Sequence, residues 1–164
     1  MPNYYPVFLD LQDKRAVIIG GGTLAGSKIA KLLDAGAKIT LVSPKINDGL
    51  KAALEQGSFE WLKREYRPGD LAGAFLGIAA TSARPVNDQV FQEAEEAGIL
   101  LNVVDEPHQC SFIAPSIVSR GPVTVAISTG GASPALARKL RETLRDSTAL
   151  EWSDMAGGLS QARK

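Results

Sequence analysis

The sequence lacks the residues that several common classes of protein require. It has one cysteine, Cys110, and one histidine, His108, so it forms no internal disulfide and no cysteine–histidine zinc site. Its 18 basic and 18 acidic residues cancel, which argues against a nucleic-acid-binding protein that works through bulk positive charge. The longest apolar runs are far shorter than a membrane span, and the N-terminus lacks the pattern of a signal peptide. We therefore expect a cytoplasmic protein without a resident metal.

Strand-like and helix-like segments alternate along the first two thirds of the chain. Strands are predicted at 15–19, 38–42, 59–66, 74–81 and 99–104. Helices are predicted between them: one with its apolar stripe on Ala25, Ile29, Leu32 and Leu33, one at 50–56, and one from Pro85 to Gly98. This alternation indicates an α/β fold, a Rossmann-like five-stranded parallel sheet with helices on both faces.

The pattern changes after Val104, where no helix separates the next two strand-like runs. Residues 112–118 and 123–128 are joined by a turn at 119–122, and a helix starts at Ser133-Pro134. One side of that helix carries Leu136, Ala137, Leu140 and Leu144. This small α+β unit has apolar strands and little sheet of its own, so we expect it to pair with a second copy of the chain.

Three consecutive glycines follow the first strand. Gly20, Gly22 and Ala25 match the dinucleotide-binding pattern G-x-G-x-x-G/A in its strand–turn–helix setting. The first glycine makes the turn, the second lets a pyrophosphate approach the backbone, and the small Ala25 lets the helix pack close to the strand. Free N–H groups at the helix start favour the phosphate charge. We therefore predict a dinucleotide site here.

The acidic residue that usually binds the ribose is missing. The second strand ends in Val42-Ser43-Pro44-Lys45 instead of an aspartate or glutamate. Ser43 can reach a ribose hydroxyl, whereas Lys45 can accommodate a 2′-phosphate. The second strand therefore leaves NAD and NADP both open.

Six segments, in order, resemble the precorrin-2 dehydrogenases, the NAD-dependent module of siroheme synthases. They are Tyr5–Leu11, Gly20–Gly22 with Ala25 and Lys28, Ala79–Thr81 with Val86-Asn87, Asn102–Asp105, Phe112–Pro115, and Ser128–Pro134 with Leu136–Arg138. The last segment, STGGASPALAR, is the most diagnostic. The resemblance spans about residues 5–145, nearly the whole chain.

The resemblance implies an NAD-dependent oxidoreductase that converts precorrin-2, a polycarboxylate tetrapyrrole, to sirohydrochlorin in siroheme or cobalamin biosynthesis. Some family members also insert iron, so ferrochelatase activity is a further expectation. The implied cofactor-binding residues are Gly20, Gly21, Gly22, Thr23, Leu24, Ser43, Pro44, Lys45, Ala80, Thr81 and Asn87. The implied substrate-binding residues are His108, Ser128, Thr129, Gly130, Gly131, Ser133 and Arg138.

Asp105 is the candidate catalytic residue. It lies just past the carboxyl end of the fifth strand, where open α/β sheets place their chemistry. A carboxylate there can take the substrate proton as hydride leaves, or orient the substrate; the alternative is a turn-forming aspartate before Glu106-Pro107. The nearby His108 and Cys110 have no spaced partners, which disfavours a catalytic dyad.

The helix after Ser133 carries Arg138, Lys139, Arg141 and Arg145. These cations suit a ligand with many carboxylates, or they form an ordinary solvated basic face.

These expectations define three parts of the chain: an NAD-binding Rossmann domain at 1–110, a dimerisation and substrate-cleft unit at 111–150, and the start of a helical segment at 151–164. We expect a homodimer that binds neither nucleic acid nor membrane. We interpret Trp61 and Trp152 as packing residues. The alternative function is a non-catalytic dinucleotide-sensing domain. Such sensors usually end the second strand in an acidic residue and lack the STGGASPALAR unit.

Overall fold

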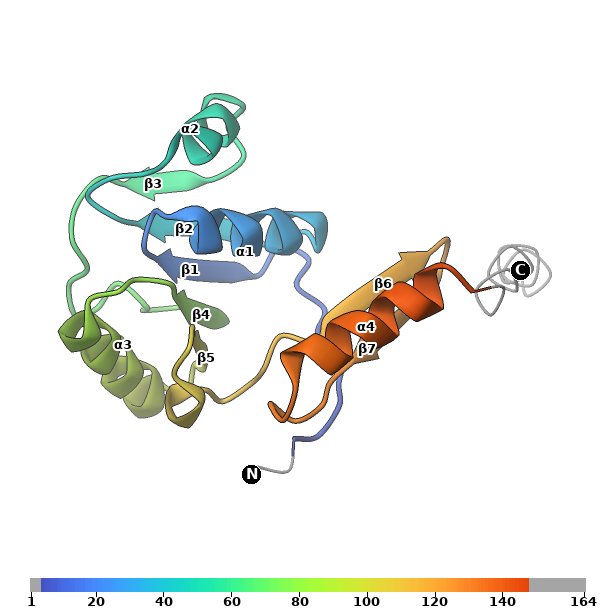
Figure 1. Ribbon diagram of the computed structural model, residues 1–164. Coiled ribbons are helices and arrows are strands. Elements are labelled where there is room, and N and C mark those ends of the chain that lie inside the picture. The colour runs from blue at the N-terminus through green and yellow to red at the C-terminus, as the bar shows by residue number, and fades with distance from the viewer. Residues whose placement is uncertain (1–3, 148–164) are drawn as a thin grey trace, which may run out of the picture. The chain divides into compact units, whose positions relative to one another are not determined.

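The computed structural model describes residues 4–147, which fall into two compact units (Figure 1). One unit is formed by Val7–Ile113. The other combines residues 4–6 with residues 114–147. Each unit is described separately below. Trp152 and the predicted helical segment at 151–164 lie outside the described residues.

The larger unit contains a five-stranded parallel sheet in the order β3-β2-β1-β4-β5. Its strands are β1 (Arg15–Ile19), β2 (Lys38–Val42), β3 (Glu60–Leu62), β4 (Leu76–Ala79) and β5 (Leu100–Val103). Its helices are α1 (Thr23–Asp34), α2 (Asp48–Glu55) and α3 (Arg84–Ala97). The strand order reverses at β1, because β2 lies on one side of it and β4 on the other. The predicted Rossmann-like sheet is therefore confirmed.

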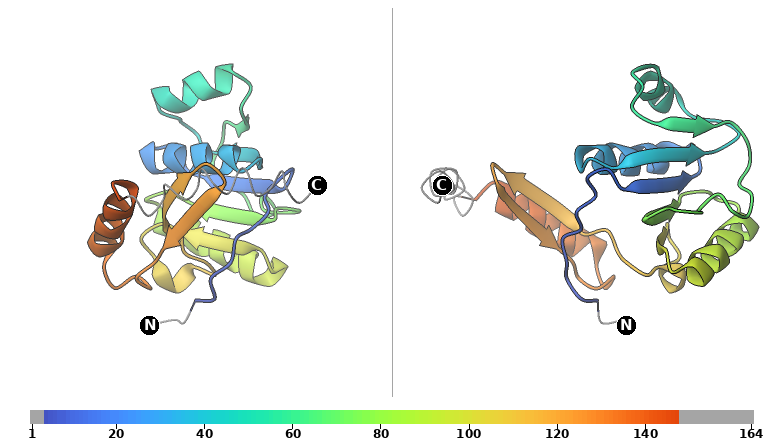
Figure 2. Two further views of the ribbon diagram at one scale, coloured as in Figure 1. Left: turned by 90° about the vertical axis from the view of Figure 1, so that its right-hand side faces the viewer. Right: turned by 180° about the vertical axis from the view of Figure 1, so that it is seen from behind.

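Both faces of the sheet are covered, as Figure 1 and Figure 2 show. Alternate strand residues divide between two apolar cores, since successive side chains of a strand point to opposite faces. Ile18 packs with Ile29 of α1 and Leu50 of α2 on one face. Val17 packs with Val90 of α3 on the other. The expectation of helices on both faces is thus also confirmed.

The third and fourth strands are shorter than predicted. β3 stops at Leu62, because the apolar Tyr66 turns into the core that α3 covers and its hydroxyl contacts Glu93. β4 starts at Leu76, because Ala74 N–H donates to Leu71 O in a turn that precedes it. Strand length is therefore overestimated from the sequence where residues at the end of a predicted strand pack from a loop or turn instead. Pro85 is the second residue of α3, not the first.

The smaller unit consists of a hairpin and one helix. Antiparallel strands β6 (Ser116–Arg120) and β7 (Val123–Ile127) pair with each other, and helix α4 (Pro134–Arg145) packs against them. Ser133 caps α4 by accepting a hydrogen bond of 3.2 Å from Leu136 N–H.

The first hairpin strand lies later in the chain than the predicted run at 112–118, because Phe112 O accepts a 3.0 Å hydrogen bond from the Asn102 amide. The strand instead continues to Arg120, which leaves Gly121-Pro122 as the turn.

The smaller unit buries few apolar side chains. Val118 and Ala137 are its buried apolar residues among those described. Leu136 and Leu140 are 51% and 42% exposed, although sequence periodicity places them on the same apolar side as Ala137. None of the helices between residues 4 and 147 is long and apolar enough to cross a membrane.

Candidate dinucleotide and substrate site

Gly20 is required by the fold itself. Its φ of +113° is rarely adopted by residues with a side chain, and a Cβ there would lie 2.3 Å from Ala80 O. Its N–H donates to Val42 O at 3.0 Å. The residue is therefore held between the end of β2 and the loop that follows β4.

Gly21 is also explained by neighbouring backbone. A Cβ at this residue would lie 1.9 Å from Lys45 O. The Gly21 carbonyl accepts a 3.0 Å hydrogen bond from Asn47 N–H, which fastens the glycine loop to the loop after β2. The backbone of Lys45, and not a ligand, therefore occupies the space beside Gly21.

Gly22 is different, because no described atom would lie within 4 Å of a Cβ added there. It is the N-cap of α1 and makes no side-chain cap, so the N–H groups of Thr23, Leu24 and Ala25 have no partner within the helix. The wholly buried Ala25 lets this end of α1 lie close against the sheet. Open space in front of free N–H groups and a helix dipole is suited to a phosphate.

The loop after β2 holds the other predicted nucleotide contacts. Ser43 is buried, and its hydroxyl donates to Lys45 O at 2.6 Å. Trp61 Nε1 donates to Ser43 O at 2.9 Å. The hydroxyl proton of Ser43 is thus used within the loop, and the predicted ribose contact stays a prediction. Pro44 and Lys45 are exposed.

The loop after β4 contains a buried acceptor without a partner. Asn87, near the start of α3, is 4% exposed, and its amide nitrogen donates to Thr81 O at 3.1 Å. Its Oδ1 has no hydrogen-bond partner among the described residues. Thr81 Oγ1 accepts from Ala83 N–H at 3.1 Å. A buried acceptor without a partner is costly, which favours a ligand that supplies a donor.

These features fit a dinucleotide. The loops after β1 and β4 flank the point where the strand order reverses, which is where open α/β sheets bind their ligands. The Gly22 face and the free N–H groups of α1 would hold the phosphates. Asn87 Oδ1 would accept a hydrogen bond from another part of the cofactor.

Asp105 follows β5 at the same edge of the sheet and is exposed. Its φ is +65°, one of two positive values recorded for residues other than glycine among those described. Glu106 N–H closes the turn by donating to Val103 O at 3.3 Å. The Cys110 thiol supports this turn through two hydrogen bonds to Val103. Its Sγ accepts from the Val103 N–H at 3.3 Å, and its S–H donates to Val103 O at 3.2 Å. Asp105 is therefore held in a fixed turn and faces solvent.

The remaining groups beside this turn differ in exposure. His108 lies on the short helix η1 (Pro107–Gln109) and is exposed. Burial raises the pKa of the Cys110 thiol, which keeps it protonated and unsuited to act as a nucleophile. Among residues 4–147, no three histidine, cysteine or acidic side chains gather as a potential metal site.

Lys28 is a further residue of interest beside this turn. This residue of α1 is half-buried, and the structure brings its ammonium into electrostatic interaction with Asp105 and Cys110. Burial lowers the pKa of Lys28, as does Lys31, while Cys110 and Asp105 oppose that shift. In the sequence, Lys28 stands out only as a member of the segment Gly20–Gly22 with Ala25 and Lys28 that resembles the precorrin-2 dehydrogenases, six residues after Gly22.

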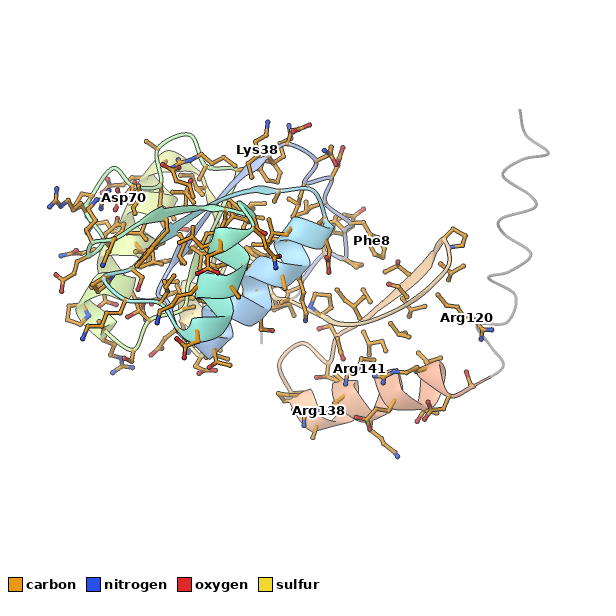
Figure 3. All side chains as sticks on the ribbon, turned by 90° about the horizontal axis from the view of Figure 1, so that it is seen from above. Phe8, Lys38, Asp70, Arg120, Arg138 and Arg141 are labelled. Atoms are coloured by element: carbon orange, nitrogen blue, oxygen red, sulfur yellow. The ribbon has the colours of Figure 1, made fainter. Side chains whose placement is uncertain are left out.

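The predicted substrate residues of the smaller unit lie in and after the loop before α4. Thr129 Oγ1 accepts from Ser133 N–H at 3.1 Å, and Ser128 Oγ accepts from Gly130 N–H at 3.0 Å. Gly130 and Gly131 both have positive φ, which makes the loop compact. Arg138 and Arg141 extend from α4 (Figure 3). Substrate contacts by this loop stay a prediction.

The fold and the glycine loop define a dinucleotide-binding protein of the Rossmann class. Residues 7–116 match a family model described as "Putative NAD(P)-binding", and the chain belongs to this NAD(P)-binding family. Residues 120–147 match a second model, described as "Sirohaem biosynthesis protein central". The two matches cover the larger unit and most of the described smaller unit.

Curated relatives carry the same two segments. The chain is 49% identical over 142 residues to siroheme synthase 1 of Aeromonas salmonicida, covering 87% of this chain and 30% of that protein. It is 42% identical over 154 residues to the siroheme synthase of Neisseria meningitidis, covering 94% and 32%. The chain thus spans about a third of the length of these relatives.

A solved structure titled "SirC, precorrin-2 dehydrogenase" is similar over 98% of this chain and 79% of that one. The TM-score is 0.82 and the sequence identity is 29%. This likeness extends across both units of the chain.

Proposed function

We propose that the chain catalyses the NAD-dependent dehydrogenation of precorrin-2 to sirohydrochlorin in siroheme biosynthesis, in the cytoplasm. The observation that carries the proposal is the likeness to the precorrin-2 dehydrogenase SirC over nearly the whole chain. The siroheme synthase relatives and the open phosphate cradle at Gly22 support it.

The reaction removes a hydride and a proton from the reduced tetrapyrrole. The open face of Gly22 and the free N–H groups of α1 would hold the NAD⁺, which would supply the hydride acceptor. The exposed Asp105 carboxylate accepts the proton or orients the substrate, and the fixed turn around it supplies the positioning that acid–base catalysis requires. Arg138 and the other cations of α4 bind substrate carboxylates.

We further propose that the working form is a homodimer built by the smaller unit. Two strands and one helix with only Val118 and Ala137 buried make too small a core among the described residues. Ile117, Leu136 and Leu140 are exposed apolar side chains of the same unit. Pairing with a second copy would remove this surface from water.

The deciding experiment supplies NAD⁺ and freshly generated precorrin-2 to the purified chain under anaerobic conditions. We expect the absorbance of sirohydrochlorin and of NADH to rise together, in equal amounts. Reactions without NAD⁺, and with NADP⁺ in its place, are the controls. A folded protein that binds NAD without producing either signal would instead support the dinucleotide-sensing alternative and overturn the enzymatic proposal.

A further inference from the structure

Lys28 is a half-buried cation that makes no direct ion pair within the part of the chain that the structure describes. Within residues 4–147, no carboxylate lies within the 4.0 Å of an ion pair with Lys28, and no side-chain hydrogen bond of its ammonium is recorded. Burial removes part of the hydration of its ammonium, and Lys31 one turn away adds repulsion. Such a group is unfavourable for the folded protein by itself, so a role in binding would account for it.

The direction of the side chain follows from the helix. Lys28 borders the buried stripe formed by Ala25 and Ile29, which packs in the same core as Val104. Helical side chains lean toward the N-terminus of their helix, and the N-terminus of α1 lies at the carboxyl edge of the sheet. The ammonium therefore extends toward the edge that holds Asp105, in agreement with their electrostatic interaction.

We propose that Lys28 is a substrate-binding residue, whose ammonium pairs with one carboxylate of the polycarboxylate tetrapyrrole beside Asp105. This inference rests on the proposed function. The tetrapyrrole carries several similar carboxylate side chains. An ion pair between Lys28 and one of them would fix which part of the ring lies against Asp105. Lys28 thus determines the orientation of the substrate as well as its affinity.

A cofactor phosphate is the other anion to consider. The free N–H groups that suit the phosphates belong to Thr23, Leu24 and Ala25, beside the open face of Gly22. The groups that act on Lys28 are Asp105 and Cys110, which follow β5. In the sheet, β5 lies on the far side of β4 from β1 and β2, so the groups after β5 are separated from the glycine loop. Lys28 is therefore directed toward Asp105, and a substrate carboxylate suits it better than a cofactor phosphate.

The test compares Lys28→Gln and Lys28→Arg with Lys31→Gln, an exposed lysine on the same helix that serves as the matched control. We would measure the steady-state KM and kcat with precorrin-2. We would also measure the Kd for NAD and the Kd for uroporphyrin, a stable porphyrin with many carboxylates. We expect Lys28→Gln to raise KM and the porphyrin Kd by roughly tenfold or more, the factor a hydrogen bond to a charged group supplies. Lys28→Arg should restore part of the loss, and Lys31→Gln should change neither value.

The salt dependence of porphyrin binding would not change if Lys28 had only a structural role. Added salt weakens porphyrin binding by screening, and this dependence should be shallower in Lys28→Gln, because one attractive charge is gone. Lys28→Met keeps the apolar stem and removes the desolvated charge, so its thermal midpoint should equal or exceed that of the wild type. That variant therefore remains testable for binding.

Two results would overturn the inference. One is an unchanged KM and porphyrin Kd in Lys28→Gln while the wild type turns precorrin-2 over. The other is a weaker NAD affinity with an unchanged KM, which would assign Lys28 to the phosphates. If the wild type has no dehydrogenase activity, the proposed function fails, and the porphyrin titration still decides whether Lys28 binds carboxylates.

Discussion

Substituting the three glycines one at a time separates the requirements of the fold from those of the ligand. Gly21→Ala places a Cβ 1.9 Å from Lys45 O, a backbone atom that cannot move alone. We expect it to lose at least the ~1–3 kcal/mol of unfolding free energy that overpacking typically costs. Gly22→Ala meets no described atom within 4 Å, and its φ of −88° and ψ of −172° suit any residue.

The stability of Gly22→Ala should therefore change little. Replacing glycine lowers the entropy of the unfolded chain and stabilises by about 0.4–1 kcal/mol. Alanine is a poorer N-cap than glycine, which costs a similar amount of order 0.5–1 kcal/mol. The two effects roughly cancel, so urea unfolding should give a free energy within about 1 kcal/mol of the wild type.

Binding should respond in the opposite way. If the pyrophosphate lies against Gly22, the new methyl group occupies its space, and an overpacking cost of about 1–3 kcal/mol weakens NAD binding roughly fivefold to 150-fold. Gly22→Leu should abolish binding and keep the fold. Isothermal titration with NAD measures both variants. A Gly22→Leu protein that binds NAD with wild-type affinity would refute the phosphate cradle.

Three further predictions test other parts of the molecule. Asp105→Ala should keep its NAD affinity and lose a factor of about 10²–10⁴ in kcat. If Asp105 is a base, Asp105→Asn should be equally impaired, whereas if Asp105 only orients the substrate, that variant should stay largely active. Near-normal turnover of Asp105→Ala would contradict both roles. The side-chain hydrogen bond from Arg64 lowers the pKa of Asp70 from its usual 3.8, and the backbone N–H of Arg67 adds to the shift. The ionised Asp70 therefore stabilises the fold above pH 3.8, and this stabilisation is lost as pH falls through the lower pKa of the folded state. Urea unfolding of Asp70→Asn should show a deficit of about 1–3 kcal/mol near neutral pH that shrinks in acid, and a pH-independent deficit argues against the charge. Leu140→Glu should yield monomers in sedimentation, whereas Phe75→Gln, an exposed apolar residue of the larger unit, should not; a monomeric wild type rules out the dimer.

Much of the fold follows from local patterns in the sequence. The bounds of β1 and β2 equal the predicted ranges, because a short apolar run between turn residues leaves little freedom to a buried parallel strand. Gly98 ends α3 in the left-handed conformation, as a glycine at the end of an amphipathic helix indicates. The glycine pattern likewise predicted a strand–turn–helix unit with an open helix N-terminus.

Side-chain roles in the loops depended on tertiary contacts that no local pattern records. The resemblance implied that Gly20, Gly21 and Gly22 all bind the cofactor. In the structure, Gly20 lies against Ala80 and Gly21 lies against Lys45, and both neighbours belong to other loops. Ser43 was predicted as a ribose ligand, and the structure engages its hydroxyl with a backbone carbonyl. A hydroxyl bonds to whichever acceptor the fold brings near, so its partner is a property of the folded chain.

The sequence by itself determined the class of fold and the place of the nucleotide loop, because strand period, helix period and glycine turns act over a few neighbouring residues. Only the tertiary structure decided that, of the three glycines after β1, Gly22 is the one with open space at its Cβ position. It also decided that Asn87 Oδ1 is a buried acceptor without a described partner, and that Asp105 acts electrostatically on Lys28, 77 positions away in the chain. These relations depend on distances between β1, β4 and β5. Hydrophobic burial on the two faces of the sheet sets those distances, and it acts on the whole chain at once.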